Sequence, residues 1–180
     1  NINKEYKYMN LNFYLAQLSS TLAWIVLIIS YWKNKDNKLL YLQIITCIFF
    51  SLSNILLGAY TGLFVVIFEI IRDYLYIKLE DDKKTFLITL PIYIVIGIFS
   101  YNKIWSLFAI FASINDGYAL IYKGKKVVLL GIVTYTLWLI YDFSYKNYAN
   151  VLAEIIVIIS NLTILISGKT ILKREITTRR

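Results

Sequence analysis

The sequence predicts an all-α integral membrane protein with seven transmembrane helices. Of its 180 residues 59% are hydrophobic and 17% are charged, whereas soluble domains average about half apolar and about a quarter charged. Uncharged runs long enough to cross a bilayer, which takes ~20 residues, recur along the chain, and most lysines gather between them. Seven such helices would use about 140 residues. We therefore expect one membrane domain over 1–180, without a soluble catalytic domain.

The first three apolar runs, within 11–77, are expected to form one three-helix unit. They cover 11–32, 39–58 and 60–77. The first run is too long for the core of a cleavable signal, and no small-residue cleavage site follows it. We therefore expect it to remain as a membrane helix.

A linker helix and a second three-helix unit are expected to follow. The linker run, 85–101, holds the only proline, Pro91. The second unit, within 104–168, contains runs at 104–122, 127–145 and 148–168, and the basic tail 169–180 comes after it. Within the fifth run, Asn115-Asp116-Gly117 would either break the helix or form a packing contact.

The basic residues predict the orientation, because cytoplasmic loops carry an excess of Lys and Arg. The connections after the first, third and fifth runs, together with the tail, hold fourteen, whereas the opposite side holds four. This asymmetry places the N-terminus outside the cytoplasmic membrane and the C-terminus in the cytoplasm. The tail is expected to fix this topology and to contact lipid.

An offset of 88 residues relates the first unit to the second. Between residues 35 and 77 the offset gives nine identities. Two polar matches carry more weight, since polar residues are rare in membrane helices: Asn54 aligns with Asp142, and Asp73 with Asn161. Four helices separate equivalent positions, so both units would have the same orientation. The arrangement is two parallel repeats joined by an inverting linker helix, a layout known from SWEET transporters.

Polar side chains at membrane depth are the candidate site, because a carboxylate or guanidinium there costs ~2.5–3.5 kcal/mol on insertion scales unless it is paired or hydrated. Helical spacing puts Glu69, Arg72 and Asp73 on one face. It likewise groups Trp138 with Asp142, and Glu154 with Asn161. The candidate substrate-binding residues are Asn54, Glu69, Arg72, Asp73, Trp138, Asp142, Glu154 and Asn161.

Two readings of these residues stay open. They could line a polar path, with Asn54, Asp142 and Glu154 toward the outer side, Glu69 near the midplane, and Asp73 and Asn161 toward the inner side. Alternatively, Glu69 and Arg72 could form a buried i,i+3 ion pair, and the remaining residues could make hydrogen bonds between helices. Trp138 could stack on a flat ligand, although core packing is the simpler role.

Several chemistries are disfavoured by composition. The chain has no histidine and one cysteine, so the usual general base, a disulfide and a cysteine metal cluster are missing. We expect no cofactor, no metal and no enzymatic activity. The net charge of +8 is explained by the cytoplasmic loops, so no nucleic-acid partner is expected. The expected partners are the lipid bilayer and a small polar solute, and the oligomeric state is open.

Short motifs resemble the YgjV family of bacterial inner membrane proteins. The matching features are Ala16-Gln17, Leu57-Gly58-Ala59-Tyr60, Arg72, Trp138-Leu139-Ile140, Glu154 and Asn161. The chain differs from the usual family residues at Glu69 and at Tyr141-Asp142. The resemblance implies a location in the bacterial inner membrane. The family is distantly similar to the SWEET and PnuC group of small-solute carriers, which implies transport by analogy.

The leading hypothesis is therefore a secondary transporter or facilitator of a small polar metabolite. An intramembrane enzyme is the first alternative, since Asp142 could belong to a carboxylate dyad that shares a proton. A membrane sensor or scaffold without transport activity is the second, with the basic tail as its contact surface.

Overall fold

The computed structural model describes residues 2–32, 38–79 and 81–167, all of them in helices or in the short connections between helices. The basic tail and most of the first loop lie outside these ranges, so the structure does not test the predictions made for them. The described helices are α1 (Ile2–Trp32), α2 (Lys38–Leu56), α3 (Tyr60–Leu79), α4 (Asp82–Ser100), α5 (Ser106–Ala119), α6 (Lys125–Ser144) and α7 (Tyr148–Ser167).

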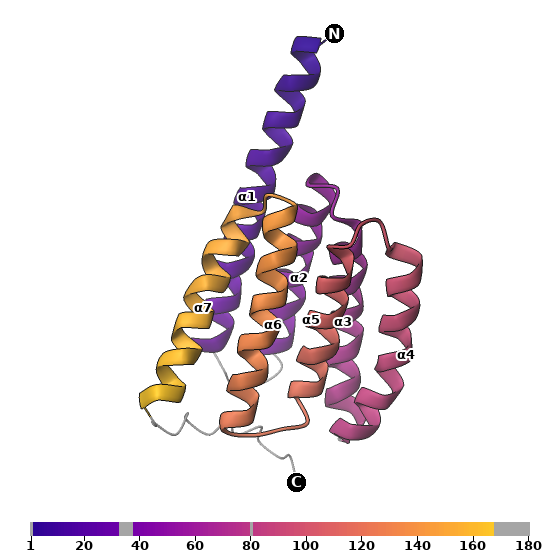
Figure 1. The fold of residues 1–180 in the computed structure, drawn as a ribbon, viewed down its shortest axis with the longest axis vertical. Coiled ribbons are helices and arrows are strands. Elements are labelled where there is room, and N and C mark those ends of the chain that lie inside the picture. The colour runs from indigo at the N-terminus through magenta and orange to yellow at the C-terminus, as the bar shows by residue number, and fades with distance from the viewer. Residues whose placement is uncertain (1, 33–37, 80, 168–180) are drawn as a thin grey trace.

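The predicted helix bounds agree with the observed ones within about three residues, except at the start of α1. This helix begins at Ile2, nine residues before the apolar run, and extends beyond the bundle (Figure 1). Residues 2–10 contain neither glycine nor proline, so nothing in the local sequence stops the helix before Leu11. Hydrophobicity predicts where a helix enters the bilayer, not where the helix itself begins.

Four helical segments of the described chain are long and apolar enough to cross a membrane: Leu11–Ile29, Asp82–Ser100, Lys125–Ser144 and Tyr148–Ser167. Of the other three helices, α3 carries charged residues and α5 has 14 residues. Helix α2 has 19 residues, of which Ile44–Leu56 form an apolar segment. Backbone hydrogen bonds from Ser106 to Lys103 and from Tyr122 to Ala119 add a tight turn at each end of α5.

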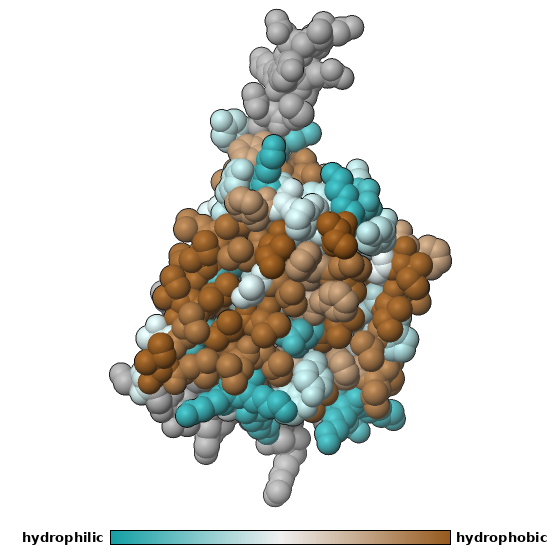
Figure 2. Space-filling view, viewed as in Figure 1, coloured by the Kyte–Doolittle hydropathy of each residue, from teal (hydrophilic) through white to brown (hydrophobic). Residues whose placement is uncertain are grey.

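The outer surface of the bundle is apolar. Large hydrophobic side chains such as Phe99 and Ile166, both 86% exposed, point away from it. Figure 2 shows a hydrophobic band across the middle of one face, with hydrophilic residues gathered below it and above it. A water-soluble monomer rarely exposes so large an apolar surface, and a lipid environment accounts for it.

Six helices form a closed ring around the core, and α4 packs outside it. Each helix of the series α1, α2, α3, α5, α6, α7 contacts the next, and α7 returns to α1. Helix α4 lies against α3 and α5 (Figure 1). We call the end of the bundle with the α2–α3, α4–α5 and α6–α7 connections the upper end, as drawn in Figure 1, and the opposite end the lower end.

Two turns at the upper end have the same backbone structure. Helix α2 ends in a Schellman motif, in which Gly58 has φ +68° and the Ala59 N–H donates to the Asn54 carbonyl at 2.8 Å. Helix α6 ends in the same motif: Lys146 has φ +61° and the Asn147 N–H donates to the Asp142 carbonyl at 2.9 Å. Every residue of one motif lies 88 positions from its counterpart in the other.

The apolar core lies between the two halves of the ring. One buried cluster contains Val65, Phe68, Tyr93 and Ile110, and a second contains Ala59, Ala109 and Tyr141. Trp138 packs against both clusters and meets Tyr141 edge to face, with ring centroids 5.6 Å apart. This contact supports the core-packing role considered for Trp138.

Candidate functional site

Two clusters of polar side chains are buried in the bundle, one toward each end. The lower cluster joins α3 to α5. The upper cluster joins α6 and α7 to α1 and α2. Six of the eight candidate residues belong to these clusters or lie next to them. Trp138 packs in the apolar core, and Asn161 lies elsewhere.

The lower cluster is built around Arg72, whose side chain is only 4% exposed. Its guanidinium pairs with Asp73 at 2.8 Å and with Asp116 of α5 at 2.9 Å. It also donates to the Ser113 carbonyl at 3.4 Å. Because a buried guanidinium without acceptors would cost several kcal/mol, these contacts hold α3 and α5 together.

Glu69 joins this cluster through a different partner. The Ser113 hydroxyl donates to Glu69 Oε1 at 2.6 Å. The Glu69–Arg72 pair considered from helical spacing is therefore replaced by Arg72–Asp73 and Arg72–Asp116 pairs. Helical spacing within α3 could not reveal Asp116, which α5 brings to Arg72.

Gly117 lies where α5 packs against the lower cluster. A Cβ at this position would lie 3.6 Å from Cδ of Arg72, and the Tyr76 hydroxyl donates to the Gly117 carbonyl at 2.8 Å. Helix α5 continues through Asn115, whose amide bonds the Leu130 carbonyl and Thr134 of α6, both at 2.8 Å. Of the two readings of 115–117, the packing contact is the observed one.

Tyr93 reaches the same region from α4. It is 1% exposed and stands edge to face against Phe68, with ring centroids 4.8 Å apart. Its hydroxyl is buried and has no hydrogen-bond partner among the described residues. This residue escaped the sequence-based prediction because a tyrosine in an apolar run resembles an interfacial or core aromatic residue.

The upper cluster contains two buried carboxyl groups that lie close together. Asp142 and Glu154 are each 3% exposed, and Asn150, one helical turn before Glu154 on α7, donates to Asp142. Asp142 Oδ2 accepts from the Asn150 amide at 3.0 Å, and its Oδ1 accepts from Asn147 at 3.4 Å. Glu154 Oε2 is buried, and no N–H or O–H group of the described residues donates to it.

Neutral hydrogen bonds extend the upper cluster to α1 and α2. The Ser20 hydroxyl lies 2.8 Å from that of Ser53 and 3.0 Å from Asn147 Oδ1. The Trp24 indole N–H donates to Asn150 Oδ1 at 3.0 Å. The Nδ2 groups of Asn147 and Asn150 therefore donate to Asp142, and their Oδ1 atoms accept from side chains of α1. Asn147 and Asn150 lie seven and four residues before Glu154, a spacing that places all three on one helix face. This usable signal was missed by the sequence-based prediction.

Gln17 fastens α1 to the turn between α6 and α7. Its amide Nε2 donates to the Lys146 carbonyl at 2.9 Å, and its Oε1 accepts from the Ala149 N–H at 2.8 Å. These bonds satisfy one carbonyl of the α6–α7 turn and one N–H in the first turn of α7. Gln17 acts here as a cap supplied by another helix.

Asn54 of α2 lies beside the upper cluster and next to the first turn of α3. Its Oδ1 would be 3.0 Å from a Cβ added at Gly62, and the Tyr141 hydroxyl would be 2.9 Å away. The Tyr141 hydroxyl accepts from the Gly62 N–H at 2.7 Å and lies 3.1 Å from the Ala59 carbonyl. Gly62 is required here by the close approach of α2 and α6 side chains.

Asn161 stands apart from both clusters. Its Nδ2 lies 3.3 Å from the position of a Cβ at Gly131 of α6, so it packs between α6 and α7. Although Asp73 is its counterpart at the offset of 88, the two residues have different surroundings. Asp142 and Asp73 also lie in different clusters and do not form the carboxylate dyad of an aspartyl protease.

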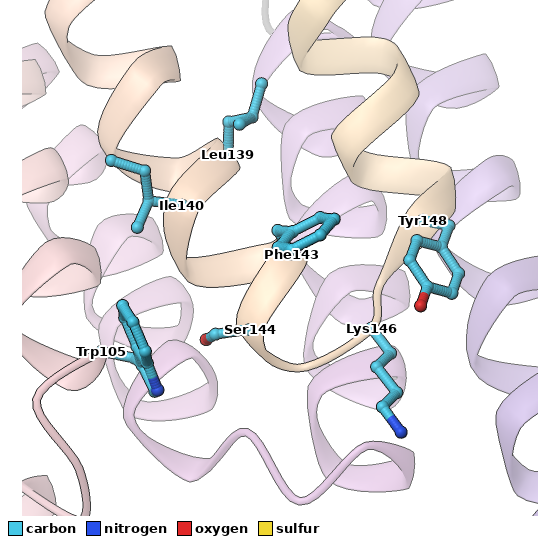
Figure 3. A pocket seen from close by; sticks show the side chains of 7 residues that line it. All are labelled: Trp105, Leu139, Ile140, Phe143, Ser144, Lys146 and Tyr148. Carbon is cyan, nitrogen blue, oxygen red and sulfur yellow. The ribbon is translucent and has the colours of Figure 1, made fainter.

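A pocket of about 450 Å³ lies near the upper end, away from the candidate residues. Figure 3 shows Trp105 and Tyr148 on opposite sides of the α6 terminus, with Phe143 and Ser144 between them. None of the eight candidate residues lines it. Among the described residues, no group of three or more His, Cys, Asp or Glu side chains is arranged to hold a metal ion.

A family model of bacterial inner membrane proteins, Imp-YgjV, matches residues 14–168. No curated protein and no solved structure matches the chain. The matched region contains both polar clusters and every helix except the first turns of α1. The apolar surface, the long apolar helices and this match agree with one another, and the chain belongs to the Imp-YgjV family of bacterial inner membrane proteins.

Proposed function

We propose that the chain is a secondary transporter or facilitator of a small polar metabolite, which works by rocking of two three-helix units. In this proposal all seven helices cross the cytoplasmic membrane, and the upper end faces outward. The units are α1–α3 and α5–α7, and α4 is the linker that gives both the same orientation. Transporters of this layout place substrate and ion sites at the interface between repeats.

The repeat is supported by backbone structure and by helix contacts. The Schellman motifs at Gly58 and Lys146 are 88 residues apart, the offset found in the sequence. Under the same offset the α1–α7 contact maps onto the α5–α3 contact, and the contacts within one unit map onto those within the other.

The observation that carries the proposal is the place of the buried polar clusters. The lower cluster connects α3 to α5, and the upper cluster connects α1 and α2 to α6 and α7. Both therefore lie between the proposed units, where rocking would open and close them. Polar groups needed only for the stability of each unit would have no reason to concentrate there.

Orientation is testable with single cysteines. In a Cys47→Ser background, Lys146→Cys at the upper end should react with a membrane-impermeant maleimide in intact cells. Lys125→Cys at the lower end should react only after the membrane is opened. The reverse pattern would overturn the proposed orientation, and labelling of both positions in intact cells would contradict the proposed span of α6.

Transport is testable in proteoliposomes loaded with the small-molecule fraction of a bacterial extract. Mass spectrometry would identify solutes that leave liposomes containing the protein but not empty ones. Efflux should fall at least tenfold in Glu69→Gln or Asn54→Ala and stay unchanged in Asp82→Asn, a carboxyl-to-amide control outside both clusters. Selective efflux that is equal in all variants would reject the assigned site, and no selective efflux would reject transport.

A further inference from the structure

We propose that Asp142 and Glu154 form a binding site for one proton, which Glu154 carries and an ionised Asp142 holds. The site belongs to the upper cluster and exists whether or not the chain moves a solute. If the chain is the transporter proposed above, this site would make the proton the ion whose binding is coupled to transport.

The hydrogen-bond pattern assigns different states to the two carboxyls. Both oxygens of Asp142 accept from amide N–H groups, Oδ1 from Asn147 and Oδ2 from Asn150. A carboxylate needs such donors. Glu154 Oε2 has none among the described residues, although it is fully buried. A carboxylic acid fits this position, because its O–H can donate to Asp142 and its other oxygen carries no charge.

Among the described residues, no cationic side chain hydrogen-bonds to the pair or to its asparagines to neutralise a second charge. The residues in hydrogen-bond contact with the pair or its asparagines are Ser20, Ser53, Trp24, Asn147 and Asn150, all of them neutral. Two like charges 4 Å apart repel by about 4 kcal/mol at an effective dielectric constant of about 20. Each buried ion would add a desolvation penalty of several kcal/mol. Binding of one proton removes most of the repulsion between the two carboxylates and the desolvation penalty of one of them.

Release of the proton would act on the contact between the units. The O–H bond of Glu154 breaks, the proton passes to water, and two adjacent carboxylates remain. Their repulsion would strain the Asn147 and Asn150 amides that connect Asp142 to α1 and α2. Protonation therefore favours the closed upper cluster of this structure, and deprotonation favours its opening.

Infrared difference spectroscopy of the purified full chain in lipid tests the site with the proton itself as probe. At neutral pH the wild type should show a carboxylic-acid C=O band that shifts in D₂O and disappears at high pH. Glu154→Gln should remove this band, whereas Glu69→Gln and Asp82→Asn should keep it. In Asp142→Asn the band should move, because the acceptor of the Glu154 O–H changes from a carboxylate to an amide.

Two results would overturn the proposal: a band that survives unchanged in Glu154→Gln, or one whose position is the same in Asp142→Asn. The band position in Asp142→Asn still tests the proposal if the Glu154→Gln protein does not fold. The outcome is separate from that of the transport assay. If the band is present and no selective efflux is found, the proton site is supported and the transport proposal is rejected. If selective efflux is found without the band, transport is supported and the proton site is rejected.

Discussion

The two polar clusters solve the problem of buried charge in opposite ways. In the lower cluster the buried charge is the Arg72 guanidinium, whose nitrogen atoms lie within 3 Å of carboxylate oxygens of Asp73 and Asp116. In the upper cluster Asp142 and Glu154 lie close together among neutral amides and hydroxyls. The lower cluster has a fixed cation between its carboxylates, whereas in our proposal a proton takes that role in the upper cluster. The contact between the two proposed units therefore contains an ion-paired cluster toward one end and, in our proposal, a proton-binding cluster toward the other.

Loss of the Arg72 charge should have the largest effect. Arg72→Met would leave Asp73 and Asp116, whose side chains are 30% and 42% exposed, without their cation. Hydrogen bonds to charged groups contribute about 1.5–3 kcal/mol each. The free energy of unfolding, measured by denaturant titration in mixed micelles, should therefore fall by about 3 kcal/mol. Lys78→Met, at an exposed position of the same helix, is the control and should change it by less than about 1 kcal/mol. Equal effects of the two variants would show that the lower ion pairs do not hold the bundle.

Two glycines offer a matched comparison of packing in the clusters. Gly62→Ala would place a Cβ 2.9 Å from Tyr141 and 3.0 Å from Asn54, and overpacking of this kind costs about 1–3 kcal/mol. Gly117→Ala would meet Arg72 at 3.6 Å, an ordinary contact, and should be neutral or stabilising through helix propensity. Thermal unfolding in detergent ranks the two variants. A Gly117→Ala protein less stable than Gly62→Ala would contradict the described packing.

The two Schellman motifs should respond to substitution with opposite signs. Gly58→Ala forces a side chain into the left-handed region and should cost about 1 kcal/mol, whereas Lys146→Gly should gain a similar amount. Both positions have positive φ, +68° and +61°, so the changes report on the same backbone structure in each unit. Destabilisation by Lys146→Gly would indicate that the Lys146 side chain has a role beyond the turn.

Single hydrogen bonds between helices should have the smallest effects. Trp24→Phe removes the donor to Asn150 in the upper cluster, and Tyr76→Phe removes the donor to Gly117 in the lower one. Such bonds in membrane bundles contribute about 0.6 kcal/mol on average. Chemical denaturation should therefore give two small and similar losses. A loss above about 2 kcal/mol for Trp24→Phe would show that the upper network acts cooperatively rather than bond by bond.

Much of the fold follows from the sequence, because hydrophobic length and basic clusters are local properties. They predicted seven helices and placed most helix ends within about three residues. The offset of 88 was found in the sequence, but the structure alone revealed that it relates the turn at Lys146 to the glycine turn at Gly58.

The site was only partly predictable, because its contacts depend on which helices are neighbours. Helical spacing grouped Glu69 with Arg72 and Asp73, but it could not supply Asp116 or Ser113 from α5. The sequence placed Asp142 and Glu154 toward the same side of the membrane without indicating that they lie close together. Asn147 and Asn150 were missed because amides near helix ends resemble ordinary turn and cap residues. Gln17 was noted only as a family motif, because its partners belong to the distant α6–α7 turn.

The contrast between the clusters is tested most directly by the melting temperature of the wild type and of Glu154→Gln as a function of pH. An unfolded glutamate is ionised above about pH 5, whereas the folded pair keeps a proton, so stability should fall as the pH rises. The wild-type melting temperature should therefore decline toward alkaline pH, and Asp82→Asn should follow it. Glu154→Gln, which has no proton to lose, should show a flatter curve. Parallel curves for the wild type and Glu154→Gln would contradict a protonated upper cluster.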